Sequence, residues 1–220
     1  MQLRPAALFV AALLSGGCGG GDGDGAGGET SSQIAAGCTA ADSPEPREPE
    51  PRQAPAVELD PDLAHTAVVQ TNCGEFTITL DPDRSPNAAA SFAALASDGY
   101  FDGTTFHRIV PGFVIQGGDP TAAGTGGPGY TTVDTPSPDT TYTNGIVAMA
   151  KAGTEPRGAA GSQFFVVTGD ELALAPDYAV IGEVTSGLDV VARIGELGDP
   201  ATEQPTATVV VESVEILRAG

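Results

Sequence analysis

The feature that most constrains the fold is a series of short segments in which apolar and polar residues alternate. Residues 66–71 and 75–80 follow this pattern and are separated only by Asn72-Cys73-Gly74, which favours a hairpin. Turn residues separate the later segments, which span 104–110, 112–118, 146–150, 163–168, 179–184 and 207–217. A two-residue period in short segments is typical of antiparallel strands, so the sequence predicts an antiparallel sheet.

Two further segments have helical patterns. The first starts at Ser85-Pro86, with serine as the N-cap and proline in the first turn, and it ends at Gly99. The second spans residues 187–198. Many short strands joined by turns, together with two helices, predict a mainly β domain built as a closed antiparallel barrel.

The first 64 residues do not have the composition of a packed domain. Residues 1–18 combine Arg4, an apolar stretch at 6–14 and small residues before Cys18, which is typical of an export signal. The apolar stretch is too short to span a bilayer. The pattern resembles a bacterial lipoprotein signal, in which Cys18 becomes the first residue and carries lipid as the only membrane anchor; the alternative is a plain secretory signal. We therefore expect an exported, extracytoplasmic protein.

Residues 19–64 are rich in glycine, proline and acidic residues, and they include the tract 43-SPEPREPEPR-52. Such a composition buries too little apolar area to offset the entropy lost on ordering, so it predicts a disordered linker. One domain, residues 65–220, remains. Export favours a disulfide between Cys38 and Cys73, 35 positions apart, with two free thiols as the alternative.

The charge and the remaining motifs exclude several classes of function. A formal net charge of −20 repels phosphate backbones, so no nucleic acid is expected to bind. No metal site is expected, because His65 and His107 lie far apart in sequence and no cysteine pair has ligand spacing. The stretch 124-GTGGPG-129 matches a phosphate-binding pattern, but Pro128 and the residues after it cannot start the required helix. Ser162 does not stand in the G-x-S-x-G turn of a hydrolase.

Arg108 is the single arginine of the mostly apolar stretch 106-FHRIVPGFVIQGGDP-120. On a strand, Phe106, Arg108 and Val110 would share one face, with the intervening residues on the other. A charge beside apolar side chains needs a partner. One interpretation is an ion pair with an acidic residue on the barrel wall. The other is a guanidinium that acts on a ligand seated against the apolar residues.

Four stretches, taken in order, resemble the cyclophilin family of peptidyl-prolyl cis–trans isomerases: 106-FHRIVPGFVIQGGD-119, 124-GTGGPGY-130, 145-GIVAMA-150 and 161-GSQFFV-166. The similarity runs from about Ala67 to Leu217. It implies an eight-stranded closed antiparallel barrel with two capping helices, and acceleration of rotation about X-Pro bonds without a cofactor. The chain most resembles the exported, lipoprotein-type cyclophilins of high-GC Gram-positive bacteria.

The resemblance also implies roles for individual residues. Arg108 stands at the catalytic arginine, and Gln116 stands at the glutamine that orients substrate and arginine. The other substrate-binding positions are Phe113, Val114, Ala150, Lys151, Phe165, Leu174 and Tyr178, the last in place of a histidine. Ala173 stands where many members have tryptophan, so weak cyclosporin binding is expected.

Together these inferences predict a monomeric peptidyl-prolyl isomerase that acts on proline-containing polypeptides outside the cytoplasm. Two alternatives stay open. The first is a binding or chaperone module with little turnover, which the departures at Ala173 and Tyr178 suggest. The second is inhibition by the protein's own Pro-rich linker, docked against the residues that would bind proline.

Overall fold

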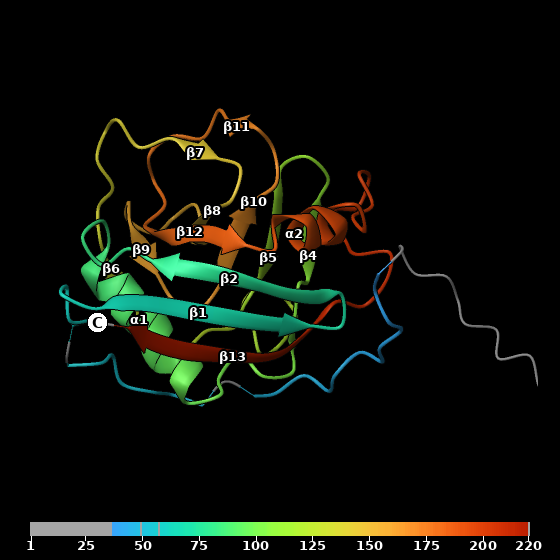
Figure 1. The fold of residues 1–220 in the computed structure, drawn as a ribbon, viewed down its shortest axis with the longest axis horizontal. Coiled ribbons are helices and arrows are strands. Elements are labelled where there is room, and N and C mark those ends of the chain that lie inside the picture. The colour runs from blue at the N-terminus through green and yellow to red at the C-terminus, as the bar shows by residue number, and fades with distance from the viewer. Residues whose placement is uncertain (1–36, 49, 57, 220) are drawn as a thin grey trace, which may run out of the picture. The chain divides into compact units, whose positions relative to one another are not determined.

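The computed structural model describes residues 37–219, apart from 49 and 57 (Figure 1). The predicted export signal, Cys18 and the first part of the predicted linker therefore lie outside the described residues. No helix in the described part of the chain is long and apolar enough to cross a membrane.

The main sheet has nine strands, and every paired neighbour is antiparallel. In spatial order they are β3 (Thr104–Thr105), β13 (Val210–Ala219), β1 (Ala64–Thr71), β2 (Gly74–Leu80), β12 (Val180–Ser186), β8 (Ile146–Met149), β10 (Phe164–Val167), β5 (Val114–Gly117) and β4 (Arg108–Val110). Figure 1 shows β13, β1, β2 and β12 side by side. The sequence therefore predicted the strand type and the long strands correctly.

The predicted closed, eight-stranded barrel is wrong, because the sheet is open and its end strands are β3 and β4. The chain changes partners between them: Thr105 pairs with Val210 of β13, whereas Arg108 pairs with Gln116 of β5. The residue alternation breaks at the same point. Phe106 is fully buried in the same core as Ile109, so the prediction that Phe106 shares a face with Arg108 is also wrong.

Two helices pack against the sheet, α1 (Pro86–Ser97) on β13 and α2 (Leu188–Gly195) on β2 and β5. The first helix has proline in its first turn as predicted, but the side chain of Ser85 makes no capping hydrogen bond. The carboxylate of Asp134 instead accepts the Ala88 N–H at 2.7 Å, which satisfies one of the free amides of the first turn. A residue 46 positions away thus caps the helix, which no local pattern could indicate.

Four two-residue strands form two small additional sheets. They pair β6 (Thr132–Val133) with β9 (Ala159–Ala160), and β7 (Tyr142–Thr143) with β11 (Glu171–Leu172). The sequence analysis missed all four, because two residues are too few to establish a two-residue period.

The strands β5, β10 and β8 bury apolar side chains on both faces, whereas β4 buries one, Ile109. On one face Ile109, Ile115 and Val166 belong to the main core. The alternate residues form a second cluster, called here the outer apolar cluster. Its buried members are Val114, Tyr142, Ile146, Ala148, Phe165, Val167, Leu172 and Val180, and its partly buried members are Phe113, Ala150, Leu174 and Tyr178.

The described residues between 37 and 63 lack regular strands and helices, as the linker prediction implied, but they contact the domain instead of standing free of it. A disulfide joins Cys38 to Cys73, and a run of hydrogen bonds follows, including Arg47 N–H to Pro120 O at 2.9 Å. We call residues 38–48 and 50–52 the strap. The covalent link and polar contacts hold this segment, which explains why a composition poor in apolar residues did not predict its placement.

Candidate functional site

The register of the sheet places Arg108, Gln116 and Phe165 in one row. The Cα of Gln116 pairs with that of Arg108 on β4 and with that of Phe165 on β10. Directly paired residues of antiparallel strands project to the same face. A guanidinium, an amide and an aromatic ring therefore lie next to one another at the edge of the outer apolar cluster.

The guanidinium of Arg108 is held on two sides. Its Nε donates to Oε2 of Glu203 at 2.8 Å, and its Nη1 donates to Oε1 of Gln116 at 3.3 Å. The side chain keeps 34% of its surface exposed. Among the described residues, Nη2 donates no hydrogen bond. The ion pair of the first interpretation therefore exists, with Glu203 as the partner. One edge of the guanidinium stays free beside apolar side chains, which is also compatible with the second interpretation, a guanidinium that acts on a ligand.

Glu203 is a site residue that the sequence analysis missed. Its backbone carbonyl accepts the Ile109 N–H at 2.9 Å, so both its main chain and its side chain contact β4. Its φ is +60°, in the left-handed region that residues other than glycine rarely adopt. Glu203 lies 95 positions from Arg108, and no pattern in the sequence connects the two.

A chain of amide hydrogen bonds extends from Gln116. Its Nε2 donates to Oε1 of Gln163 at 3.0 Å, and Nε2 of Gln163 donates to the carbonyl of Gly126 at 3.0 Å. Gln163 was also missed, although a signal existed. It stands two positions before Phe165, so the two-residue period of a strand places both side chains on the same face.

The apolar side of the site is built around three aromatic rings. Phe165 meets Tyr178 edge-on, with ring centroids 5.4 Å apart, and Tyr142 meets Tyr178 at 6.1 Å. The hydroxyl of Tyr142 donates to Tyr178 O at 2.9 Å and accepts Tyr178 N–H at 3.0 Å. Burial raises the pKa of Tyr142, so the hydroxyl stays protonated and keeps its donor role.

The predicted proline-binding residues all belong to the outer apolar cluster. Val114 and Phe165 are buried in it, whereas Phe113, Leu174 and Tyr178 are partly exposed. Leu172 is a buried member that the sequence analysis did not name. The exposed Ala173 follows it, at the position of the absent tryptophan.

Ala150 and Lys151 were also predicted as substrate-binding positions; Ala150 is a partly buried member of this cluster, and Lys151 follows it in the chain. The Ala150 N–H donates to the carbonyl of Gln163 at 2.8 Å and is therefore not free for a substrate. The ammonium of Lys151 donates to the backbone carbonyls of Ala152 and Glu155 at 3.3 and 3.2 Å. It also lies 5.7 Å from the ring centroid of Tyr178, which links it to the aromatic group.

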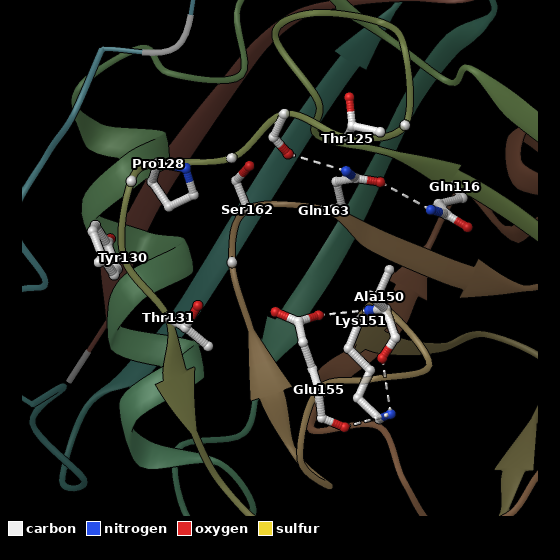
Figure 2. A pocket seen from close by; sticks show the side chains of 16 residues that line it. Gln116, Thr125, Pro128, Tyr130, Thr131, Ala150, Lys151, Glu155, Ser162 and Gln163 are labelled. Carbon is white, nitrogen blue, oxygen red and sulfur yellow. Dashed lines mark hydrogen bonds between the residues drawn. The ribbon is translucent and has the colours of Figure 1, made fainter.

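A cavity of about 650 Å³ adjoins the row (Figure 2). Gln116 and Ala150 line it and also border the outer apolar cluster, so the two features are continuous. The opposite wall is the loop of residues 124–131, which contains no helix, in agreement with the rejection of a phosphate site. Lys151, Ala152, Glu155 and residues 161–163 complete the lining.

Asp119 shapes the loop that forms this wall. It is fully buried, and its carboxylate accepts hydrogen bonds from Thr121 N–H at 2.7 Å and from Gly126 N–H at 3.1 Å. Burial alone would raise the pKa of this carboxyl, but the hydrogen bonds from Thr121 and Gly126 hold it below its usual value. Asp119 is therefore a negatively charged anchor for both ends of the turn.

His107, which precedes Arg108, differs from it in charge. Burial lowers the pKa of its imidazole, against the opposing attraction of the Asp119 carboxylate. The ring is therefore neutral near pH 7. Among the described residues, no group of three or more His, Cys, Asp and Glu side chains is arranged to hold a metal ion.

Comparison with known proteins assigns the family. Residues 66–216 match the family model described as cyclophilin type peptidyl-prolyl cis-trans isomerase/CLD. Peptidyl-prolyl cis-trans isomerase B of Streptomyces anulatus is 37% identical over 68% of this chain and 95% of its own length. Peptidyl-prolyl cis-trans isomerase A of Mycobacterium tuberculosis is 35% identical over 73% of this chain and 97% of its own length.

Solved structures agree with the sequence relatives. The crystal structure of a cyclophilin type peptidyl-prolyl cis-trans isomerase from Cryptosporidium parvum superposes with a TM-score of 0.65 at 28% identity, covering 71% of this chain and 99% of the other. A second crystal structure of that protein, in the presence of the dipeptide Ala-Pro, gives a TM-score of 0.63 at 29% identity over 69% and 98% of the two chains. The chain thus belongs to the cyclophilin-type peptidyl-prolyl cis–trans isomerases.

Proposed function

We propose that this isomerase accelerates rotation about X-Pro bonds of exported proteins through a hydrogen bond from Arg108 to the twisted prolyl amide. The observation that carries the proposal is the row of Arg108, Gln116 and Phe165 on one face of the sheet. In this row a guanidinium with a free edge lies beside an apolar surface. A prolyl residue combines a polar amide with an apolar ring, so the guanidinium can bond the amide while the apolar surface contacts the ring.

The barrier to rotation lies in the prolyl amide itself. Rotation costs about 18–20 kcal/mol because resonance must be lost at the transition state. No covalent bond forms or breaks, so neither a nucleophile nor a metal is needed. When the bond twists, the prolyl nitrogen regains a lone pair, and a guanidinium that donates to it stabilises this state more than the planar one.

The neighbours of Arg108 define how the cation is presented. Glu203 and Gln116 hold Nε and Nη1, so Nη2 is the edge directed to the substrate in this proposal. The partly exposed members of the outer apolar cluster seat the prolyl ring and exclude water, which strengthens the hydrogen bond. Proline-containing polypeptides are the proposed partners, in line with the dipeptide Ala-Pro present in the crystals of the related protein.

The proposed location is outside the cytoplasm, with Cys18 acylated and the protein held at the membrane by this lipid alone. Support comes from the signal-like residues 1–18 and from the Cys38–Cys73 disulfide, since such bonds persist in oxidising compartments. Replacement of Cys18 by alanine should release the protein from membranes into the soluble fraction. A protein that fractionates identically with and without Cys18 would instead support a plain secretory signal.

The direct test of function is prolyl exchange in a short X-Pro peptide, followed by nuclear magnetic resonance. The chain should accelerate exchange well above the uncatalysed rate, and Arg108→Ala should lower kcat/KM by about 100-fold or more. Arg84→Ala is the matched control, because the exposed Arg84 side chain makes no hydrogen bond to other described residues. If the wild-type chain accelerates no peptide across several X residues, the alternative of a binding module with little turnover replaces this proposal.

A further inference from the structure

The strap contacts the domain at two places far apart along its length. Near its start, Cys38 is bonded to Cys73, and Thr39 N–H donates to Asn72 O at 2.8 Å while Asn72 Nδ2 donates to Thr39 O at 2.7 Å. Near its end, Arg52 contacts the 124–131 loop that forms a wall of the cavity, and Arg47 contacts Pro120, which precedes that loop. Covalent attachment at the start keeps the far end close to this loop at a high effective concentration.

One backbone hydrogen bond connects the strap to that loop, and a second connects it to the residues that lead into the loop. Arg47 N–H donates to Pro120 O at 2.9 Å, and Arg52 N–H donates to Pro128 O at 2.8 Å. Pro128 lines the cavity, and Pro120 follows the anchoring residue Asp119. The alternating prolines of the strap carry no N–H, so the arginines supply the donors at these two points.

The same two arginines hold Tyr100. Arg47 Nη2 donates to Tyr100 O at 2.6 Å, and the Arg52 guanidinium lies 5.2 Å from the centroid of the Tyr100 ring. Arg52 Nη1 also donates to Asp98 Oδ2 at 2.8 Å. On its other side the Tyr100 hydroxyl is 3.2 Å from Oγ of Ser162, which lines the cavity. The strap therefore contacts the cavity lining both through the loop and through Tyr100.

Within the domain, Asp119 and Gln163 bond to Gly126 of this loop, and the hydroxyls of Ser91 and Tyr130 lie 2.9 Å apart. Residues 124–131 have almost no regular secondary structure and include four glycines, which lose much conformational freedom when ordered. The strap fits closely against it, because a Cβ added to Gly129 would lie only 2.9 Å from the Cα of Pro51. In contrast, the hydrogen bonds of the strap end on Asn72, Asp98, Tyr100, Pro120, Pro128 and Thr208, outside the outer apolar cluster.

We propose that the strap positions the 124–131 wall of the cavity for the polypeptide that flanks the proline, with Arg47 and Arg52 as positioning residues. This inference rests on the proposed function, because the cavity adjoins Gln116 of the catalytic row. It differs from docking of the Pro-rich segment as an inhibitor. The strap supports binding from behind the wall and leaves the outer apolar cluster accessible to a substrate.

The kinetic test uses the full chain and two substrates, a capped Ala-Pro dipeptide and an octapeptide with the same Ala-Pro at its centre. For the octapeptide, the double variant Arg47→Ala/Arg52→Ala should show a KM about five- to tenfold higher with kcat unchanged, the effect of one lost hydrogen bond or slightly more. For the dipeptide, kcat/KM should stay as in the wild type, and Arg84→Ala should leave both substrates unaffected. Equal effects on the two substrates, or no effect on either, would overturn the proposal.

A second measurement separates this inference from the proposed activity. Hydrogen exchange of the Gly126 amide, which bonds to Asp119, should become severalfold faster in the double variant and in Cys38→Ser, while exchange in β1 and β2 stays unchanged. If the wild-type chain shows no isomerase activity, the proposed function fails and this exchange still decides the role of the strap. Unchanged exchange at Gly126 in both variants would contradict it.

Discussion

The two sides of the site are held in place by different means. On the polar side, Arg108 and Gln116 are partly exposed, and their orientation depends on a few hydrogen bonds, which Arg108 donates to Glu203 and Gln116 and which Gln116 donates to Gln163. On the apolar side, most of the cluster around Phe165 is buried and is also one face of the sheet. Changes on the polar side should therefore alter chemistry with little effect on stability, whereas changes on the apolar side should alter both.

On the apolar side, the substitution expected to have the largest effect on stability and substrate binding is Phe165→Ala. Removal of a buried phenyl ring typically lowers the free energy of unfolding by about 3–5 kcal/mol, and this ring also borders the proposed prolyl seat. We expect a clear loss of stability in chemical denaturation together with a raised KM. Phe92→Ala in the main core is the control, because it should lose similar stability without raising the KM of the folded fraction. Equal KM values in the two variants would remove Phe165 from the substrate surface.

On the polar side, the sharpest change is Arg108→Lys, which keeps the charge. The three N–H donors of an ammonium radiate from one nitrogen, so they cannot reproduce the planar arrangement in which separate nitrogens of Arg108 bond Glu203 and Gln116 and leave Nη2 for a substrate. We expect kcat to fall on the order of 10- to 100-fold, part of the loss expected for complete removal of the donor. The midpoint of thermal unfolding should stay within about 2 °C of the wild type, in line with the small contribution of exposed ion pairs. Loss of stability as large as that of Phe165→Ala would show that the two sides do not differ as we describe.

The substitution Tyr142→Phe tests whether the apolar side acts through shape alone. It removes the hydroxyl that donates to Tyr178 O and accepts Tyr178 N–H, and leaves that N–H without its partner. The expected cost is about 1–3 kcal/mol of unfolding free energy. Because Tyr178 is partly exposed at the substrate side, KM should rise while kcat is retained. A fall in kcat with unchanged KM would mean that Tyr178 stabilises the twisted prolyl amide of the transition state and does not help to bind the prolyl ring.

The same contrast explains what could be predicted from the sequence. Residues such as Phe165 and Val114 belong to strands with a local period, and the order of the four motifs predicted roles for them and for Arg108. Glu203 and Asp134 act on partners 95 and 46 positions away, so their roles depend on the folded chain alone. The break at Phe106–His107 had no local signal either, because it arises where the chain leaves β13 and joins β5.

The smallest effect is expected from pH, through His107, whose imidazole lies close to Gly124 of the cavity wall. Its pKa in the folded chain is lowered from 6.5 by burial, with Asp119 opposing and Arg108 adding to the shift. The unfolded chain therefore binds more protons than the folded chain as the pH falls below about 6.5, and folding stability must decrease there. The lowered pKa of Asp119 adds a second decrease, but only below its own usual value of 3.8.

Replacement of His107 by glutamine separates these two contributions. Between pH 7 and pH 5 the unfolding free energy of the wild type should decline more steeply than that of His107→Gln, whereas below pH 4 both should fall together. Urea denaturation at each pH gives the two curves. Parallel curves above pH 5 would mean that the imidazole is as easily protonated in the folded chain as in the unfolded one. His107 would then belong with Arg108 and Gln116 to the partly exposed, polar side of the site.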